Sequence, residues 1–293
     1  MKIIKKNIYL LIRILQNILP LYFIIFLLYI KRAFVQIYIN YKIFCFAPYF
    51  RDPNYTLCSI CKKIKIIKLN KKIIIYNYNK LNKSMLIING GGLISIDLLD
   101  IVVIKNILPI MKNYNIIVIK YDLLNKYSET LKDIITTFEI LLRYNINIDI
   151  FIGNSIGCTL LLDLFNVYKQ FKNKKLILIS PIVNYDIKYN ENVKKDIINI
   201  NFFNNIKNKY YDNIIDIDYD NLPNILIICS TNEIFYYDII NFYKKCKIFR
   251  FTSKKKTEIY YIKNGIHSEY TTFGLFNNNK IKEITNRIIH FIK

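Results

Sequence analysis

Short segments dominated by Ile, Leu, Val and Tyr alternate with longer segments of helical length along most of this chain. The short segments include "SMLIING", "NIIVIKY", "NIDIFI", "KKLILISP", "NILIICS" and "TEIYYIKNG". Strands without a polar face must be buried on both faces, as in a parallel sheet covered by helices on either side. The intervening segments, such as "SETLKDIITTFEILLRY", carry apolar residues at helical spacing. The sequence therefore predicts an α/β domain with a mostly parallel central sheet and helices on both faces.

The chain divides into three parts by composition. We expect a membrane anchor over residues 1–32, a connecting segment over 33–62 and one α/β domain over 63–293. The domain begins with two short β-rich runs, "KIKIIKL" and "KIIIYNY", which are typical of a hairpin. Residues 182–221 follow the sixth expected strand and are rich in Asn, Asp, Lys and Tyr. We interpret them as a small, partly helical insertion that forms a cap.

The N-terminal segment is almost entirely apolar from Ile8 to Ile30, roughly the ~20 residues that span a bilayer. We expect an uncleaved transmembrane helix, because Lys31 and Arg32 end the segment where a cleavage site would need small residues. A cleaved signal peptide and a helix lying on the membrane are the alternatives. The flanking charges favour a cytosolic N-terminus, which would place the domain in the lumen of the endoplasmic reticulum.

The formal net charge of +22 is the property that most suggests a nucleic-acid partner. The lysines are spread along the whole chain, however, so we expect a lysine-rich solvated surface and no nucleic-acid partner. Cys58 and Cys61 form a C-x-x-C motif without a second pair or spaced histidines, so we expect no zinc site. These two cysteines form either a disulfide in an oxidising lumen or two free thiols.

Ser155 lies between Gly153 and Gly157 in the motif G-x-S-x-G, although the chain has only seven glycines. The residues before it have the pattern of a buried strand, and those after it the pattern of a buried helix. A sharp strand-to-helix turn forces the central serine into a strained backbone conformation and leaves no room for side chains beside it. We therefore predict that Ser155 is a nucleophile.

A serine hydroxyl needs a base, and the chain has only two histidines. His267 follows the last expected strand, where α/β active sites assemble, whereas His290 in the final helix is expected to pack or face solvent. Glu233, three residues past a strand end, is the expected acid that orients the base. Asp238 is the alternative acid, or a cap of the following helix.

An oxyanion hole is predicted from "IINGGGL", where three glycines follow a strand and can present bare N–H groups to a substrate. Ile156, directly after the expected nucleophile, adds another N–H group. Neither phosphate-binding pattern, G-x-G-x-x-G or G-x-x-x-x-G-K-[ST], is present in the sequence.

The motifs "NGGG", "GNSIG", "ISP", "STNEIFYYD" and "GIH" occur in the order and approximate spacing of the α/β-hydrolase superfamily. Over residues 63–293 the chain resembles the hormone-sensitive-lipase-like esterases, including arylacetamide deacetylases and fungal steryl acetyl hydrolases. The resemblance implies a nucleophile at Ser155, a base at His267, an acid at Glu233, and oxyanion donors at Gly91, Gly92 and Ile156.

The resemblance further implies a membrane-anchored esterase that acts on small lipophilic esters, such as steryl acetates, without metal or cofactor. Two other classes of function stay open. The first is a catalytically degenerate hydrolase fold that binds lipid or a protein partner at the membrane, and the second is a basic module that binds membrane surfaces or nucleic acid.

Overall fold

The computed structural model describes residues 66–94, 97–187, 190–212, 216–251, 253, 255–274 and 279–293. The expected anchor, the connecting segment and the Cys58/Cys61 pair lie outside these residues. Among the helices that are described, none is both long and apolar enough to cross a bilayer.

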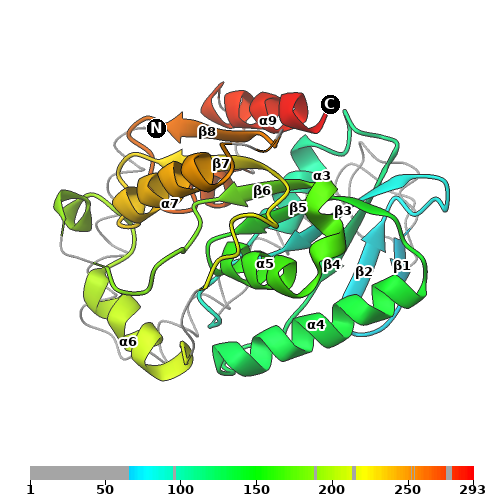
Figure 1. Cartoon of the computed structure of the whole chain (residues 1–293), viewed down its shortest axis with the longest axis horizontal. Coiled ribbons are helices and arrows are strands. Elements are labelled where there is room, and N and C mark those ends of the chain that lie inside the picture. Colours follow the sequence, from blue (N-terminus) through cyan, green and yellow to red (C-terminus); the bar gives the residue numbers. More distant parts are fainter. Residues whose placement is uncertain are drawn as a thin grey trace, which may run out of the picture.

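A single sheet of eight strands, in the order β1-β2-β4-β3-β5-β6-β7-β8, forms the centre of the described structure (Figure 1). The hairpin of β1 and β2 is antiparallel, as expected, and β2 pairs antiparallel with β4. All remaining pairs are parallel, which confirms the predicted mostly parallel sheet. The strands are β1 (Ile66–Lys68), β2 (Ile73–Tyr76), β3 (Lys83–Ile88), β4 (Tyr114–Ile119), β5 (Ile148–Asn154), β6 (Lys175–Ile179), β7 (Asn224–Ser230) and β8 (Thr257–Ile262).

Helices cover both faces of this sheet. One core cluster packs α4, α5 and α7 against one face, and these helices lie in front of the sheet in Figure 1. A second cluster packs α3, α8 and α9 against the other face. The helices are α3 (Leu99–Asn106), α4 (Tyr127–Arg143), α5 (Ile156–Val167), α6 (Ile200–Tyr210), α7 (Tyr236–Phe249), α8 (Glu269–Phe273) and α9 (Asn279–Ile292), with short 3₁₀ turns η1 (Lys169–Asn173) and η2 (Glu191–Lys194).

The isoleucine-rich strands follow from this double covering. In β3, Leu86 and Ile88 belong to the cluster with α5, whereas Met85 and Ile87 belong to the cluster with α3 and α9. All four side chains are fully buried, and each such burial contributes roughly 1.5–3 kcal/mol before entropy is counted. From Met85 to Ile88, alternate residues therefore pack into two different cores.

The parallel strands carry their connecting loops to one edge of the sheet. The loops after β3, β5, β7 and β8 hold the residues singled out in the sequence, and the segment between β6 and β7 carries η2 and α6. Figure 1 shows α6 set apart from the sheet, on the side to which the arrowheads of β6 and β8 point. This segment includes residues 182–221, the expected insertion.

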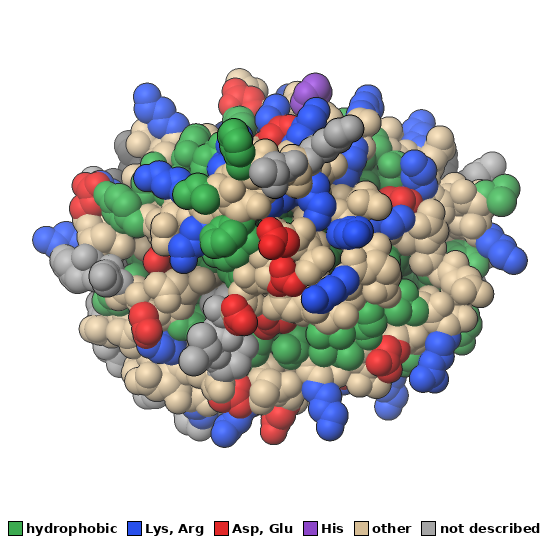
Figure 2. All heavy atoms as spheres, in the orientation of Figure 1, with side chains coloured by type: hydrophobic (Ala, Val, Ile, Leu, Met, Phe, Trp, Pro, Cys, Tyr) green, Lys and Arg blue, Asp and Glu red, His purple; other side chains and the backbone are tan. Residues whose placement is uncertain are grey.

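Lysine and arginine side chains are scattered over the face of the molecule shown in Figure 2, with Asp and Glu side chains among them. On this face they do not gather into one basic patch. In the described part of the chain, Cys158, Cys229 and Cys246 are free and buried.

Candidate active site

Ser155 occupies the turn between β5 and α5 in a backbone conformation that side chains rarely adopt. Its φ is 53° and its ψ is −123°, and such a conformation costs on the order of 1–3 kcal/mol. Two hydrogen bonds hold the turn: the Ser155 N–H donates to Ile179 O at 2.9 Å, and the Cys158 N–H donates to Ser155 O at 3.0 Å. The surrounding structure thus fixes the serine at the end of the strand.

The two glycines of the motif are required by the closeness of neighbouring backbone. A Cβ atom on Gly153 would lie 2.9 Å from Gly157 O, and a Cβ atom on Gly157 would lie 2.3 Å from Ile88 O. Real Cβ atoms do not approach backbone this closely, so neither position accepts a side chain without moving the strand. This crowding confirms the prediction that the turn at Ser155 leaves no room for side chains at the two flanking glycines.

The structure brings Ser155, His267 and Glu233 together in one chain of hydrogen bonds. His267 Nε2 lies 2.8 Å from Ser155 Oγ, and His267 Nδ1 lies 3.0 Å from Glu233 Oε2. All three side chains are buried. A carboxylate only accepts hydrogen bonds, so it holds the imidazole proton on Nδ1 and leaves Nε2 as the acceptor for the serine hydroxyl. The arrangement can therefore remove a proton from Ser155.

Glu233 is the carboxylate that faces the imidazole. Its second oxygen, Oε1, accepts from the Ser230 N–H at 2.7 Å, which fixes the side chain after the end of β7. Asp238 lies in the first turn of α7 and accepts a hydrogen bond from Asn184 Nδ2 at 3.0 Å. His290, the second histidine, is exposed on α9.

The glycine loop after β3 lies against the turn that carries Ser155. A Cβ atom on Gly90 would be 2.5 Å from Asn154 O and 2.9 Å from Ser155 Cβ, so the loop packs directly against the turn. Gly91 and Gly92 have φ values of 116° and 66°, which a residue with a side chain rarely adopts. Ile156 begins α5, where N–H groups at the positive end of the helix point away from the helix. The predicted oxyanion donors therefore belong to a glycine loop that contacts Ser155 and to the first residue of α5.

Side chains anchor the glycine loop from behind. Asp97 Oδ2 accepts from the Gly90 N–H at 2.8 Å and from Asn154 Nδ2 at 2.5 Å, which links the loop to the residue before Ser155. The Tyr121 hydroxyl donates to Asn89 O at 3.0 Å. Burial raises the pKa of the Asp97 carboxyl to about 6. None of these anchoring roles was predicted from the sequence.

Asp196 and Asn192 are buried polar residues near this site that the sequence analysis missed. Asp196 accepts hydrogen bonds from the backbone N–H groups of His267, at 2.9 Å, and Ile234, at 2.7 Å. Asn192 Nδ2 donates to the carbonyl oxygen of Glu233 at 3.1 Å. Both residues belong to the polar segment between β6 and β7, where no sequence signal separates them from exposed neighbours.

The stability of the fold should depend on the protonation of Asp196. Burial raises the pKa of this carboxyl from 3.8 to about 6, against the lowering effects of the nearby His267 and of two backbone N–H donors. Between about pH 6 and pH 4 the folded chain therefore binds a proton that the unfolded chain lacks, so this group favours folding more strongly as the pH falls. We expect the free energy of unfolding of the wild type, relative to Asp196→Asn, to rise from pH 7 to pH 4 in urea titrations.

The exposed carboxylate of Glu191, in η2 and five residues before Asp196, provides the control for this measurement. A Glu191→Gln variant should not show the same pH-dependent difference from the wild type. A difference between wild type and Asp196→Asn that stays constant across this pH range would contradict the raised pKa.

Comparison with solved structures relates this geometry to a known fold. The chain is similar to a Pyrobaculum calidifontis esterase (TM-score 0.70, 14% identity, covering 97% of each chain). It is also similar to the Francisella virulence factor BioJ (TM-score 0.63, 21% identity, covering 78% of this chain and 84% of that chain). A third similar structure is a Rhizomucor miehei esterase (TM-score 0.61, 14% identity, covering 78% and 82%).

These similarities establish the fold. The chain has the α/β-hydrolase fold, with Ser155 at the strand-to-helix turn after β5 and His267 and Glu233 on loops after β8 and β7. No protein-family model matches the sequence, and no curated protein matches it.

Proposed function

We propose that the protein is a serine carboxylic-ester hydrolase. The observation that carries this proposal is the hydrogen-bonded series from Ser155 through His267 to Glu233, built on a strained turn. Strain and buried carboxylates lower stability, and folds retain them where the chemistry requires them. The neighbouring structures that are esterases are consistent with this reaction class.

The proposed reaction has two halves. Ser155 Oγ attacks the ester carbonyl carbon and gives its proton to His267 Nε2, while the N–H groups of Gly91, Gly92 and Ile156 bind the carbonyl oxygen as it becomes negative. The intermediate collapses when the bond to the alcohol breaks, and His267 returns the proton to that alcohol. A water molecule, activated in the same way, then cleaves the acyl-serine ester. Glu233 orients the imidazole and stabilises its positive charge throughout. The proposed steps use neither a metal nor a cofactor.

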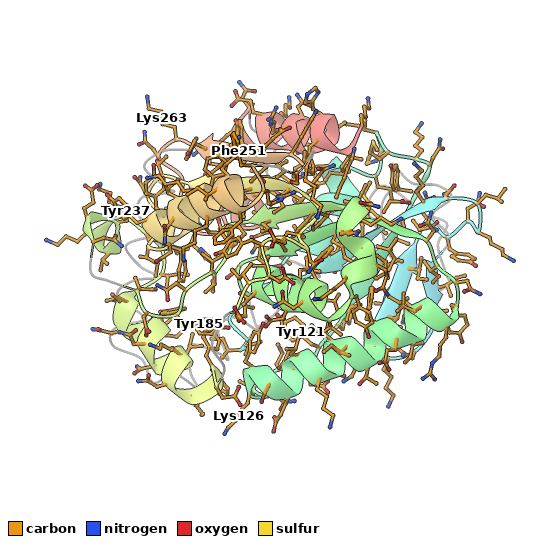
Figure 3. All side chains as sticks on the ribbon, viewed as in Figure 1. Tyr121, Lys126, Tyr185, Tyr237, Phe251 and Lys263 are labelled. Carbon is orange, nitrogen blue, oxygen red and sulfur yellow. The ribbon has the colours of Figure 1, made fainter. Side chains whose placement is uncertain are left out.

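A row of aromatic rings beside the site supports the proposal that the substrate is lipophilic. Phe235 lies 5.0 Å from the His267 ring and 5.1 Å from Phe203, between ring centroids. The row continues from Phe203 to Tyr211 at 6.0 Å and from Tyr211 to Tyr185 at 4.6 Å. In Figure 3, Tyr185 lies between α6 and α4.

The row also reaches the glycine loop. The Tyr211 hydroxyl would lie 3.8 Å from a Cβ atom on Gly92, and it has no hydrogen-bond partner among the described residues. Apolar rings therefore extend from the proposed base to the proposed oxyanion donors, and they offer one polar group beside the glycine loop.

We propose that the substrates are small esters with a short acyl chain on a lipophilic alcohol, such as steryl acetates. The resemblance to arylacetamide deacetylases and steryl acetyl hydrolases supports this substrate class, and so does the aromatic row. We further propose that the apolar stretch from Ile8 to Ile30 anchors the protein to membrane lipid, with the catalytic domain in the lumen of the endoplasmic reticulum. A membrane anchor would place the enzyme where such substrates dissolve.

The proposed function is tested by labelling with a fluorophosphonate probe together with turnover of p-nitrophenyl esters of increasing acyl length. We expect the wild-type protein to become labelled at Ser155, because the probe reacts only with a serine that a base has activated. We also expect kcat/KM to be highest for acetyl to butyryl esters and to fall for long acyl chains.

A folded wild-type protein that neither takes up the label nor turns over any ester would favour the non-catalytic alternative, a hydrolase fold that binds lipid or a protein partner. A maximum of kcat/KM at long acyl chains would leave the reaction class intact and contradict the proposed substrate class.

A further inference from the structure

Two loops must stay in register for Glu233 to face His267. Glu233 follows β7 and His267 follows β8, and the hydrogen bond between their side chains is 3.0 Å long. The pairing of β7 with β8 fixes the two backbones as far as Ser230 and Ile262, and the Asn232 N–H then donates to Gly265 O at 2.9 Å. Glu233 and His267 lie just beyond these bonds, so their relative position depends on further contacts.

The carboxylate of Asp196 binds both loops at once. Its Oδ1 atom accepts from the His267 N–H at 2.9 Å, and its Oδ2 atom accepts from the N–H of Ile234, the residue after Glu233, at 2.7 Å. Asp196 is only 1% exposed, so water does not compete for these bonds. Hydrogen bonds from backbone N–H groups to a carboxylate are short and strong, which makes this a rigid bridge.

Asn192 binds the acid loop at two further points. Its Nδ2 atom donates to Thr231 O and to Glu233 O, both at 3.1 Å. Asn192 is itself held in η2, because its N–H donates to Asn190 Oδ1 at 2.9 Å. Residues from the segment between β6 and β7 therefore hydrogen-bond to the backbone before, at and after Glu233.

We propose that Asp196 is a positioning residue that sets the geometry of the Glu233–His267 pair through the backbones of both loops. This inference rests on the proposed function, in which that pair activates Ser155. The segment between β6 and β7 carries α6 and three of the four rings of the aromatic row. Under this proposal it also fixes the acid and the base, so it is part of the catalytic apparatus and not only a cover. A shift of about 1 Å in such a pair can cost roughly 10²-fold in rate.

The substitution Asp196→Asn tests the proposal with little change in side-chain size. An asparagine offers one oxygen and one NH₂ group, so one of the two backbone N–H groups must face another donor. We expect kcat to fall by roughly 10²-fold with KM unchanged, because the geometry of the acid–base pair is disturbed and the surface that binds substrate is not. Glu191→Gln, which removes an exposed carboxylate from η2, should keep the wild-type kcat.

A second measurement follows the geometry without any substrate. The chain has two histidines, so ¹⁵N-histidine NMR spectra contain signals from only His267 and the exposed His290. In Asp196→Asn we expect the His267 imidazole signals to move and the downfield signal of the proton between Nδ1 and Glu233 to weaken, while the His290 signals stay in place.

Wild-type His267 signals together with a wild-type kcat in the folded variant would overturn the proposal. A fall in activity that only matches the fraction of unfolded protein would also overturn it. If Asp196→Asn does not fold, Asn192→Ser takes its place, because it removes the two hydrogen bonds from Asn192 to the loop that carries Glu233. A wild-type kcat with unmoved His267 signals in that variant would overturn the proposal that the segment between β6 and β7 positions this loop. A wild-type protein without esterase activity would refute the proposed function, and the NMR measurement would still decide the role of Asp196.

Discussion

Replacing Ser155 with alanine should abolish ester turnover while leaving the protein folded. The hydroxyl contributes one hydrogen bond, to His267 Nε2, and little to the core, so the loss of stability should be small. Loss of the nucleophile in a triad costs on the order of 10⁶ in kcat. The measurement is the rate of p-nitrophenyl acetate hydrolysis by protein whose folding has been checked by circular dichroism.

Labelling with a fluorophosphonate separates this effect from a general loss of structure. Ser155→Ala should take up no label, whereas Ser128→Ala, which changes an exposed serine of α4, should label like the wild type. A folded Ser155→Ala protein that hydrolyses esters at the wild-type rate would mean that G-x-S-x-G is only a tight turn in this chain.

Replacing Glu233 with glutamine should lower kcat by roughly 10⁴-fold, the size of effect seen when a triad carboxylate becomes an amide. The amide keeps the volume of the side chain, but its NH₂ group can be turned toward His267 Nδ1. The imidazole would then carry its proton on Nε2, where it cannot accept the proton of Ser155. Steady-state kinetics on a short-chain ester measures this loss.

Asp238→Asn is the matched control for the acid. Asp238 lies five residues further along the chain and accepts a hydrogen bond from Asn184, so its replacement should change kcat little. If Asp238→Asn instead proves the more damaging of the two variants, the role of the acid belongs to Asp238 and not to Glu233.

The sheet could be predicted because its strands have no polar face. In β3 and β7, alternate isoleucine and leucine residues pack into the two cores on opposite faces of the sheet. Burial on both faces therefore explains why these segments are apolar at consecutive positions. The serine turn could be predicted because glycine is rare in this chain and two of its seven glycines bracket Ser155. In the buried strands and at the two glycines, the local structure admits few residue types. The residue types in the sequence therefore indicate that structure.

Asp196, Asn192 and Asp97 could not be predicted, because their roles arise from contacts across the fold. Asp196 lies among Asn, Lys and Ile residues that resemble a solvated surface segment, and its partners are 38 and 71 residues away in sequence. Nothing local marks an aspartate whose hydrogen-bond donors are backbone N–H groups of distant loops.

Ser155 and His267, which share a hydrogen bond, are 112 residues apart in sequence, and Asp196 between them bridges the loops after β7 and β8. Such long-range contacts close large loops, and they form only once the chain between them is ordered. A fragment that ends before β8 lacks His267, the proposed base, however well its other strands assemble. During refolding, ester turnover should therefore return no earlier than the last parallel strand, which makes catalysis a sensitive probe of whether the entire sheet has assembled.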